Sequence, residues 1–293
     1  MLTIFRLARN ARPDALDAEA RNNMRRSVSN LAWDVVEDGA VAKLFCDYGL
    51  SAIDVAPGKY FPDPLSATPD DIARVRRFWA DRGVEIYALQ ALLFGEDHLN
   101  MFGAPAVQDA VLARLDAVCR IAVGLGARRL VFGSRANRNR AGLDDATAFE
   151  RAVDFFSRAA SLVAGWELVM TLEAIPASYG ANFMTRTGEA ADIVMAVDAD
   201  ALRLHLDTGA MFVNGEDPVE TIAAYAPLIA HVHASDPGLA TPGDAGCDHA
   251  SVAAALRRYR PELTVTIEML PPENTPQLAA LQRALIFASQ VYG

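Results

Sequence analysis

The segment Leu204-His205-Leu206-Asp207 alternates apolar and polar side chains and ends in a potential metal ligand. Three further segments in the second half of the chain have the same form: Val169-Met170-Thr171-Leu172-Glu173, Ala230-His231-Val232-His233 and Val265-Thr266-Ile267-Glu268. Alternation with a period of two predicts that each segment is a β-strand. Their terminal residues are roughly thirty residues apart, which is typical of consecutive strand–helix units. If the strands are parallel neighbours, their last side chains lie together at one end of a sheet.

The same alternation of strands and helices extends over most of the chain. Strands are expected near 28–33, 52–56, 85–93, 129–134, 167–174, 202–209, 228–235 and 263–270. Eight such units without a break in composition predict an α/β fold, a single (β/α)8 TIM barrel over residues 27–293. A doubly wound open sheet is the alternative. It normally has a glycine-rich loop after the first strand, whereas Trp33-Asp34-Val35-Val36 stands here.

Several of the predicted helices have recognisable ends. Thr68-Pro69-Asp70-Asp71 combines an N-cap, a first-turn proline and two carboxylates. Asp217-Pro218-Val219-Glu220 adds a capping-box glutamate. We expect helices to stop at Gly83, Gly124 and Gly126.

Residues 1–26 differ from the rest of the chain. They mix arginines with acids and alanines and show no continuous apolar stripe. We therefore predict an N-terminal extension that is peripheral or mobile and lies outside the barrel.

The composition excludes several classes of protein. The net charge of −10 opposes binding to phosphate backbones, so no nucleic acid partner is expected. No apolar run approaches the about 18 residues of a membrane span, and the first residues do not form a signal peptide. We expect a cytoplasmic protein without a membrane partner. The three cysteines are widely scattered, which argues against a disulfide framework or a thiolate zinc site.

In the last four strands, polar and apolar residues occupy alternate positions, so the polar side chains are expected on one face of the sheet and the apolar side chains on the other. Because barrel enzymes carry their chemistry at the C-terminal ends of the strands, we expect the terminal ligands to converge there. These ligands are Glu173, Asp207, His233 and Glu268. Three carboxylates in one barrel mouth repel each other unless a cation compensates their charge. Three carboxylates and one imidazole suit one divalent ion. We expect Mn²⁺, with Mg²⁺, Co²⁺ and Zn²⁺ as alternatives.

At these residues the chain resembles the xylose-isomerase-like superfamily of sugar isomerases and epimerases. The matching motifs are Leu172-Glu173, Leu206-Asp207-Thr208-Gly209, His231-Val232-His233 and Ile267-Glu268, and the resemblance extends over about residues 27–290. It implies that Glu173, Asp207, His233 and Glu268 hold one divalent metal ion. It also implies that Glu173 and Glu268 form an acid/base pair on opposite faces of a bound sugar.

The function implied is that of a metal-dependent isomerase or epimerase of a sugar or sugar derivative. One glutamate removes the proton next to the carbonyl and leaves an enediolate. Return of a proton to the opposite face gives epimerisation, and its return to the adjacent carbon gives isomerisation. Either Glu173 or Glu268 can be the base. The partner is a small carbohydrate, and the resemblance also implies a homo-oligomer.

Three positions depart from the pattern of the family's epimerases. Ala210, Tyr179 and Leu239 stand where those enzymes often carry His, Glu and Arg. The usual contacts to a ketohexose are therefore missing. Two alternatives follow: a metal-dependent dehydratase, an inosose-type lyase on the same barrel, and a non-catalytic sugar-binding barrel. The three-metal apurinic-site endonucleases of this fold need more histidines than the five present.

Five further residues are expected near the site. Gln90, Lys59 and His249 are predicted to bind substrate, with Lys59 able to neutralise a phosphate or carboxylate. The alternatives are a solvated loop lysine for Lys59 and a helix-cap position for His249. His205 and His231 lie one inward step below the ligands, and we expect them to support the metal site.

Overall fold

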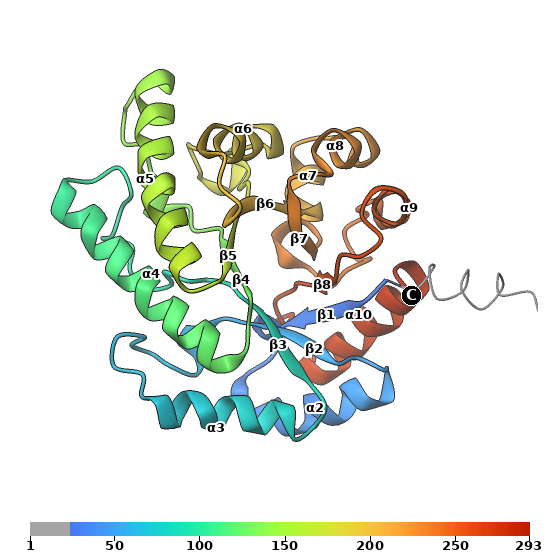
Figure 1. The fold of residues 1–293 in the computed structure, drawn as a ribbon. Coiled ribbons are helices and arrows are strands. Elements are labelled where there is room, and N and C mark those ends of the chain that lie inside the picture. The colour runs from blue at the N-terminus through green and yellow to red at the C-terminus, as the bar shows by residue number, and fades with distance from the viewer. Residues whose placement is uncertain (1–23) are drawn as a thin grey trace, which may run out of the picture.

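The computed structural model describes residues 24–293, so residues 1–23 of the predicted N-terminal extension lie outside the described part. Eight parallel strands close into a barrel in chain order (Figure 1). They are β1 (Arg26–Ser29), β2 (Ala52–Val55), β3 (Glu85–Leu89), β4 (Arg129–Phe132), β5 (Val169–Leu172), β6 (Leu202–Asp207), β7 (Ile229–Ala234) and β8 (Val265–Ile267). The barrel closes where Arg26, Ser27 and Val28 pair with Val265, Thr266 and Ile267. This closure confirms the predicted TIM barrel, but the barrel includes Arg26, which was predicted to belong to the extension outside it.

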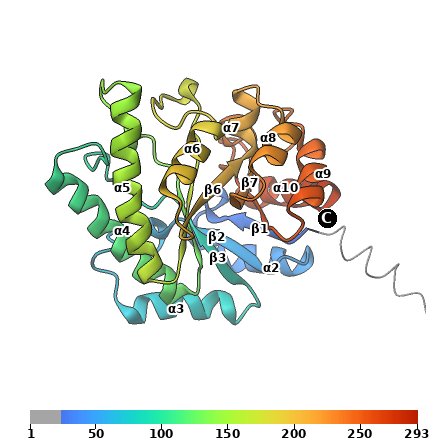
Figure 2. The ribbon, with the colours of Figure 1, turned by 45° about the horizontal axis from the view of Figure 1, so that its top comes forward.

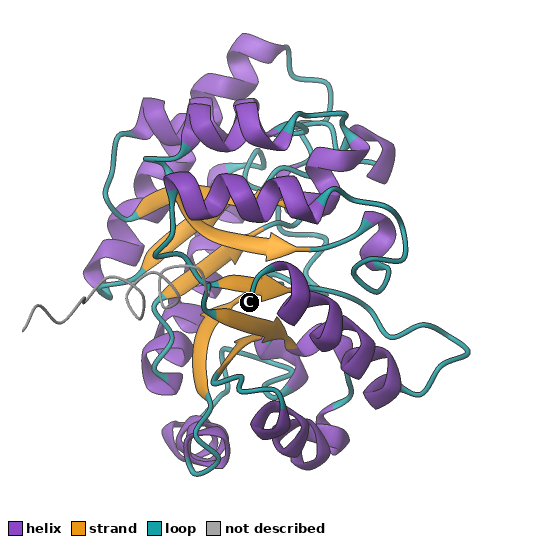
Figure 3. Cartoon of the chain, turned by 90° about the vertical axis from the view of Figure 1, so that its right-hand side faces the viewer, coloured by secondary structure: helices purple, strands orange, loops and turns teal. Residues whose placement is uncertain are grey.

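Helices connect the strands and surround them (Figures 1 and 2). They are α2 (Asp38–Asp47), α3 (Pro69–Ala80), α4 (Pro105–Leu125), α5 (Asp145–Gly165), α6 (Thr187–Val197), α7 (Thr208–Val213), α8 (Pro218–Tyr225), α9 (His249–Tyr259) and α10 (Gln277–Val291). The strand arrows run in one general direction, so the loops that follow the strands gather at one end (Figure 3). Within residues 24–293, no helix has the length and apolar character needed to cross a membrane.

The predicted helix caps are present. Thr68 Oγ1 accepts a hydrogen bond from the Asp71 N–H, and Asp217 Oδ1 accepts one from the Glu220 N–H. Gly126 ends α4 with φ +90°, a conformation that L side chains rarely adopt. Gly124, in contrast, is not a helix stop, because α4 continues to Leu125. A Cβ on Gly124 would lie 2.6 Å from Ile72 Cγ2, so this glycine allows α3 and α4 to pack closely.

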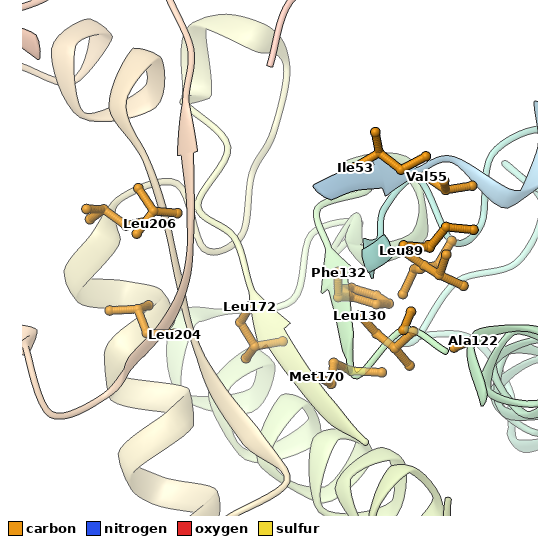
Figure 4. Packing of buried hydrophobic residues seen from close by; sticks show 14 of the residues in the cluster. Ile53, Val55, Leu89, Ala122, Leu130, Phe132, Met170, Leu172, Leu204 and Leu206 are labelled. Carbon is orange, nitrogen blue, oxygen red and sulfur yellow. The ribbon is translucent and has the colours of Figure 1, made fainter. Parts of the chain in front are cut away.

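The apolar face of the strands packs outward against the helices, as the parity predicts. Met170, Leu172, Leu204 and Leu206 are completely buried in the main hydrophobic cluster, and the leucines of β6 lie on the same side of that strand (Figure 4). Phe132 of β4 meets Phe156 of α5 edge to face, with ring centroids 5.4 Å apart. The other parity points into the barrel, where it forms the site.

Every strand ends before its predicted end, and the difference is largest for β1 and β3, which stop at Ser29 and Leu89 instead of 33 and 93. Asn30–Ala32 form a 3-10 turn, η1, because Ser29 Oγ accepts a hydrogen bond from the Leu31 N–H at 3.2 Å and caps the turn. β3 ends at Leu89, and Ala91 has φ +53°, which is incompatible with a continuing strand. These early ends leave irregular backbone around the barrel mouth.

Candidate active site

The structure brings the four predicted ligands together at the C-terminal ends of the last four strands. Glu173, Asp207 and His233 each offer a ligand atom, and these atoms lie within 4.8 Å of one another. His205 also offers an atom within that distance. Glu268 joins the group through Oε2, which lies 3.2 Å from His233 Nδ1. The parallel register causes this convergence, since Asp207 and His233 are paired across β6 and β7.

Glu173 occupies space that a glycine leaves open. A Cβ on Gly133, directly after β4, would lie 1.7 Å from Glu173 Oε2. Any other residue at position 133 therefore collides with this carboxylate. The backbone of Glu173 is held as well, since Arg138 Nη1 donates to its carbonyl at 2.5 Å.

Asp207 is fixed by two hydrogen-bond donors. Its Oδ1 accepts from the Ala210 N–H at 2.6 Å and so caps α7, and its Oδ2 accepts from Ser235 Oγ at 2.7 Å. Ser235 Oγ in turn accepts from the Gly209 N–H at 3.1 Å. A Cβ on Gly209 would lie 2.7 Å from Ser235 Oγ, so the glycine lets the start of α7 approach the end of β7.

His233 lies between two carboxylates. Its Nδ1 faces Glu268 Oε2, and its Nε2 lies 3.4 Å from Asp54 Oδ2. Asp54 comes from β2 and is completely buried. Glu268 Oε1 accepts a hydrogen bond from Gln90 Nε2 at 2.6 Å. Gln90 is thereby placed beside a predicted ligand, as its position at the end of β3 suggested.

The carboxylates at the mouth bind protons more tightly than ordinary ones. Burial, with the charges of Glu268 and Asp207, raises the pKa of Glu173 to about 8. Burial, with the charge of Glu268, raises the pKa of Asp207 to about 6, although the Ser235 hydrogen bond opposes this rise. Burial also acts to raise the pKa of Glu268, but His233 and Gln90 outweigh it and lower the value overall. The pKa of His233 is raised above its usual value, because Glu268 and Asp54 outweigh the opposing effect of burial.

This donor set fits a divalent cation. Glu173 and Asp207 keep partial exposure toward the mouth, whereas His233 and Glu268 are buried. Carboxylates with raised pKa values are groups whose negative charge lacks compensation, and a bound cation supplies it. Oxygen-rich sets with one imidazole suit Mn²⁺, Mg²⁺ or Co²⁺.

The other two predicted substrate contacts are tied to protein atoms. Lys59 Nζ donates to the carbonyl oxygens of Asn30, at 2.7 Å, and of Trp33. Burial lowers the pKa of Lys59, although Asp34 and Asp38 oppose this shift.

His249 is the first residue of α9 and is buried. Its Nε2 lies 3.0 Å from Asp236 Oδ1, and its Nδ1 lies 2.8 Å from the Tyr292 hydroxyl. Asp236 Oδ2 accepts from the backbone N–H groups of Gly243 and Ala245, so the loop between β7 and α9 is held around this carboxylate.

His205 and His231 lie in the barrel interior, and both are almost completely buried. They are paired across β6 and β7, and their rings stack with centroids 5.1 Å apart. His231 Nε2 lies 2.8 Å from Asp54 Oδ2. Asp54 therefore contacts both His231 and His233 and connects the interior to the ligand cluster.

Two of the departures from the epimerase pattern lie where loops cross. The Tyr179 hydroxyl accepts a hydrogen bond from the Gly238 N–H at 2.9 Å, which joins the loop after β5 to the loop after β7. Leu239, the next residue, has φ +56°. Tyr179 thus connects two mouth loops to each other.

Four residues around the cluster were not predicted from the sequence: Asp54, Arg138, Ser235 and Asp236. Asp54 carried a signal, since it is an acid inside the apolar strand Ala52-Ile53-Asp54-Val55. Ser235 and Asp236 directly follow the His231-Val232-His233 motif. Arg138 had no distinguishing signal, because it is one of several arginines between residues 135 and 140.

Comparisons with known proteins show which folds are similar. No curated protein matches this chain. D-psicose 3-epimerase, solved in the presence of D-fructose, has a TM-score of 0.76 and 15% identity, covering 92% of this chain and 100% of that one. L-ribulose 3-epimerase has a TM-score of 0.74 and 18% identity, covering 92% and 94%. A probable 3-DHS dehydratase from Bacillus anthracis has a TM-score of 0.70 and 14% identity, covering 92% and 98%.

These structures establish a shared barrel, since their identities are too low to carry more. The family model described as xylose isomerase-like TIM barrel matches residues 43–286, which is most of the sequence. This chain therefore belongs to the xylose isomerase-like TIM barrel family.

Proposed function

We propose that the protein is a divalent-metal-dependent isomerase or epimerase of a sugar or sugar derivative. The observation that carries the proposal is the cluster of Glu173, Asp207, His233 and Glu268 at the C-terminal mouth of the barrel. Family membership and the two sugar 3-epimerases of similar fold support it. These four residues would hold the cation. When bound, it would polarise the carbonyl and hydroxyl oxygens of the substrate.

Glu173 and Glu268 are the proposed acid/base pair. They come from β5 and β8, so a substrate in the mouth lies between them. One carboxylate takes the proton from the carbon next to the carbonyl, and the other delivers a proton to the opposite face of the same carbon. Delivery to the neighbouring carbon instead gives isomerisation.

Neighbouring groups hold the two glutamates in different protonation states. Gln90 donates to Glu268, and His233 lies beside it, so this carboxyl favours its charged form. Glu173 in the metal-free protein favours its protonated form, because burial and the charges of Glu268 and Asp207 raise its pKa. A bound cation stabilises the charged form of both glutamates, so this difference belongs to the metal-free state.

A dehydratase is the second candidate. Ala210 replaces a histidine that sugar epimerases of the family often carry, and one barrel of similar fold is a probable dehydratase. In that reaction the same proton abstraction is followed by loss of a β-hydroxyl as water. The two reactions share the first step and differ in the fate of the substrate.

Deuterium exchange distinguishes these functions. The Mn²⁺-loaded protein is incubated in D₂O with a panel of ketoses, sugar acids and inososes, and the products are analysed by NMR and mass spectrometry. A product that carries deuterium on carbon and has not lost water supports the isomerase or epimerase. A product that has lost water supports the dehydratase. Exchange with no member of the panel indicates a non-catalytic sugar-binding barrel.

Variants test the two-glutamate mechanism. Glu173→Gln and Glu268→Gln should each abolish exchange, because either one removes half of the acid/base pair. Glu220→Gln is the control: it removes an exposed carboxylate in the first turn of α8, and the variant should exchange normally. Full exchange by either active-site variant would overturn the mechanism.

A further inference from the structure

His205 is a buried imidazole without a partner in the interior of the barrel. It lies on β6 two residues before Asp207, on the same inward face, and is 1% exposed. Among residues 24–293, neither of its ring nitrogens has a hydrogen-bond partner. Buried polar groups in native proteins are normally bonded, so two orphaned nitrogens on one ring require an explanation.

The surroundings of His205 supply that explanation. One of its nitrogens lies within 4.8 Å of ligand atoms of Glu173, Asp207 and His233. Its ring centroid is 4.3 Å from that of His233, and the two rings are inclined by 78°. The ring therefore borders the ligand cluster at the mouth.

His231 provides the contrast. It is paired with His205 across the strands and is also buried, and its nitrogens likewise make no well-aligned hydrogen bond, but its Nε2 lies 2.8 Å from Asp54 Oδ2. The Asp54 carboxylate therefore already faces this nitrogen of His231. Within residues 24–293, no hydrogen bond joins His205 to a carboxylate, and ligand atoms of Glu173, Asp207 and His233 lie near its ring.

We propose that His205 is a direct ligand of the divalent cation, so that the centre contains two imidazoles together with its carboxylates. This inference rests on the proposed function, which places the cation at Glu173, Asp207, His233 and Glu268. It replaces the supporting role that the sequence suggested for His205. A second imidazole shifts the preference of the centre from Mg²⁺ toward Co²⁺ and Zn²⁺, because imidazole is a better ligand for those ions.

The number of bound imidazoles is measured directly. The wild-type protein is loaded with Mn²⁺, and nitrogen couplings are recorded by pulsed EPR, with ¹⁵N-histidine labelling to identify the signals. Two coordinated histidine nitrogens are expected. This measurement needs no variant, so it stands even if substitution of a buried histidine prevents folding.

Two matched variants extend the test. His205→Phe keeps the bulk of the ring and should reduce the count to one nitrogen. His231→Phe removes an equally buried imidazole and should leave two. Calorimetric titration of His205→Phe should show a loss in Co²⁺ affinity of more than about 100-fold and a loss in Mg²⁺ affinity of less than about 10-fold.

The outcomes separate this inference from the proposed function. One coordinated nitrogen in the wild type, with normal deuterium exchange, overturns the role of His205 and leaves the function intact. Two nitrogens without exchange on any substrate sustain the role of His205 and count against the enzyme. Failure to bind Mn²⁺, Co²⁺ or Mg²⁺ overturns both.

Discussion

The substitution Gly133→Ala tests whether the position of Glu173 matters, without altering Glu173 itself. The added Cβ would lie 1.7 Å from Glu173 Oε2. Gly133 is not among the glycines with positive φ, so its backbone accepts alanine. The collision with the carboxylate is therefore the main consequence of this change.

The size of the effect follows from that distance. A carbon and an oxygen that are not bonded approach to about 3.3 Å, so Oε2 has to move by roughly 1.6 Å. A displacement of about 1 Å in a catalytic group can cost about 100-fold in rate, which corresponds to roughly 2.7 kcal/mol in the barrier. We expect a loss of at least this size in deuterium exchange, together with weaker Mn²⁺ binding.

Exchange is measured in D₂O on the best substrate of the panel, and Mn²⁺ affinity by calorimetric titration. Gly58→Ala is the matched control, because Gly58 also follows a barrel strand, does not have positive φ, and has nothing within 4 Å of an added Cβ. Thermal unfolding of both variants shows that the barrel is intact. Wild-type exchange and Mn²⁺ affinity in Gly133→Ala would refute the placement of Glu173 at the centre.

Four further predictions concern binding and stability. Because burial raises the pKa of Glu173 to about 8 and that of Asp207 to about 6, protons compete with the cation, and calorimetry should show Mn²⁺ affinity rising from pH 6 to pH 8. In the metal-free protein, the free energy of unfolding should fall as the pH rises from about 5 to about 8, because folded Glu173 keeps a proton that the unfolded chain has lost, and it should level off above about pH 8; urea titrations that show the reverse would contradict the raised pKa. Ser235→Ala removes the donor to Asp207 Oδ2 and should weaken Mn²⁺ binding by about 10- to 100-fold, whereas Ser289→Ala on the outer face of α10 should not. Gly124→Ala places a Cβ 2.6 Å from Ile72 Cγ2 and should destabilise the barrel by about 1 to 3 kcal/mol in urea without changing Mn²⁺ affinity.

The barrel and its ligand cluster were predictable because both follow from strand periodicity. Each of Glu173, Asp207, His233 and Glu268 lies at the C-terminal end of a strand, and these strands are parallel neighbours. Closure of the sheet therefore brings the four side chains together, whatever the positions of the helices. The inward parity of His205 and His231 follows from the same rule. The alternation of polar and apolar residues within a strand is a local property, so it can be read directly from the sequence.

Contacts across the barrel were not predictable in this way. Asp54 lies on β2, which is not a neighbour of β7, yet it reaches His231 and His233. Such a contact depends on the depth of each side chain in the closed barrel, which strand patterns do not encode. Lys59 shows a second reason: its carbonyl partners belong to a turn formed where a longer strand was expected.

Asp207 has two roles, because its carboxylate faces the ligand cluster and also caps the N-terminus of α7. The length of its side chain is consequently set by the backbone of α7 and by the centre together. A glutamate at this position would keep the charge, but its extra methylene would move the carboxylate away from the Ala210 N–H that it caps. Glutamate therefore cannot replace Asp207 even though it has the same charge, because the carboxylate at this position has to bind the ion and cap the helix.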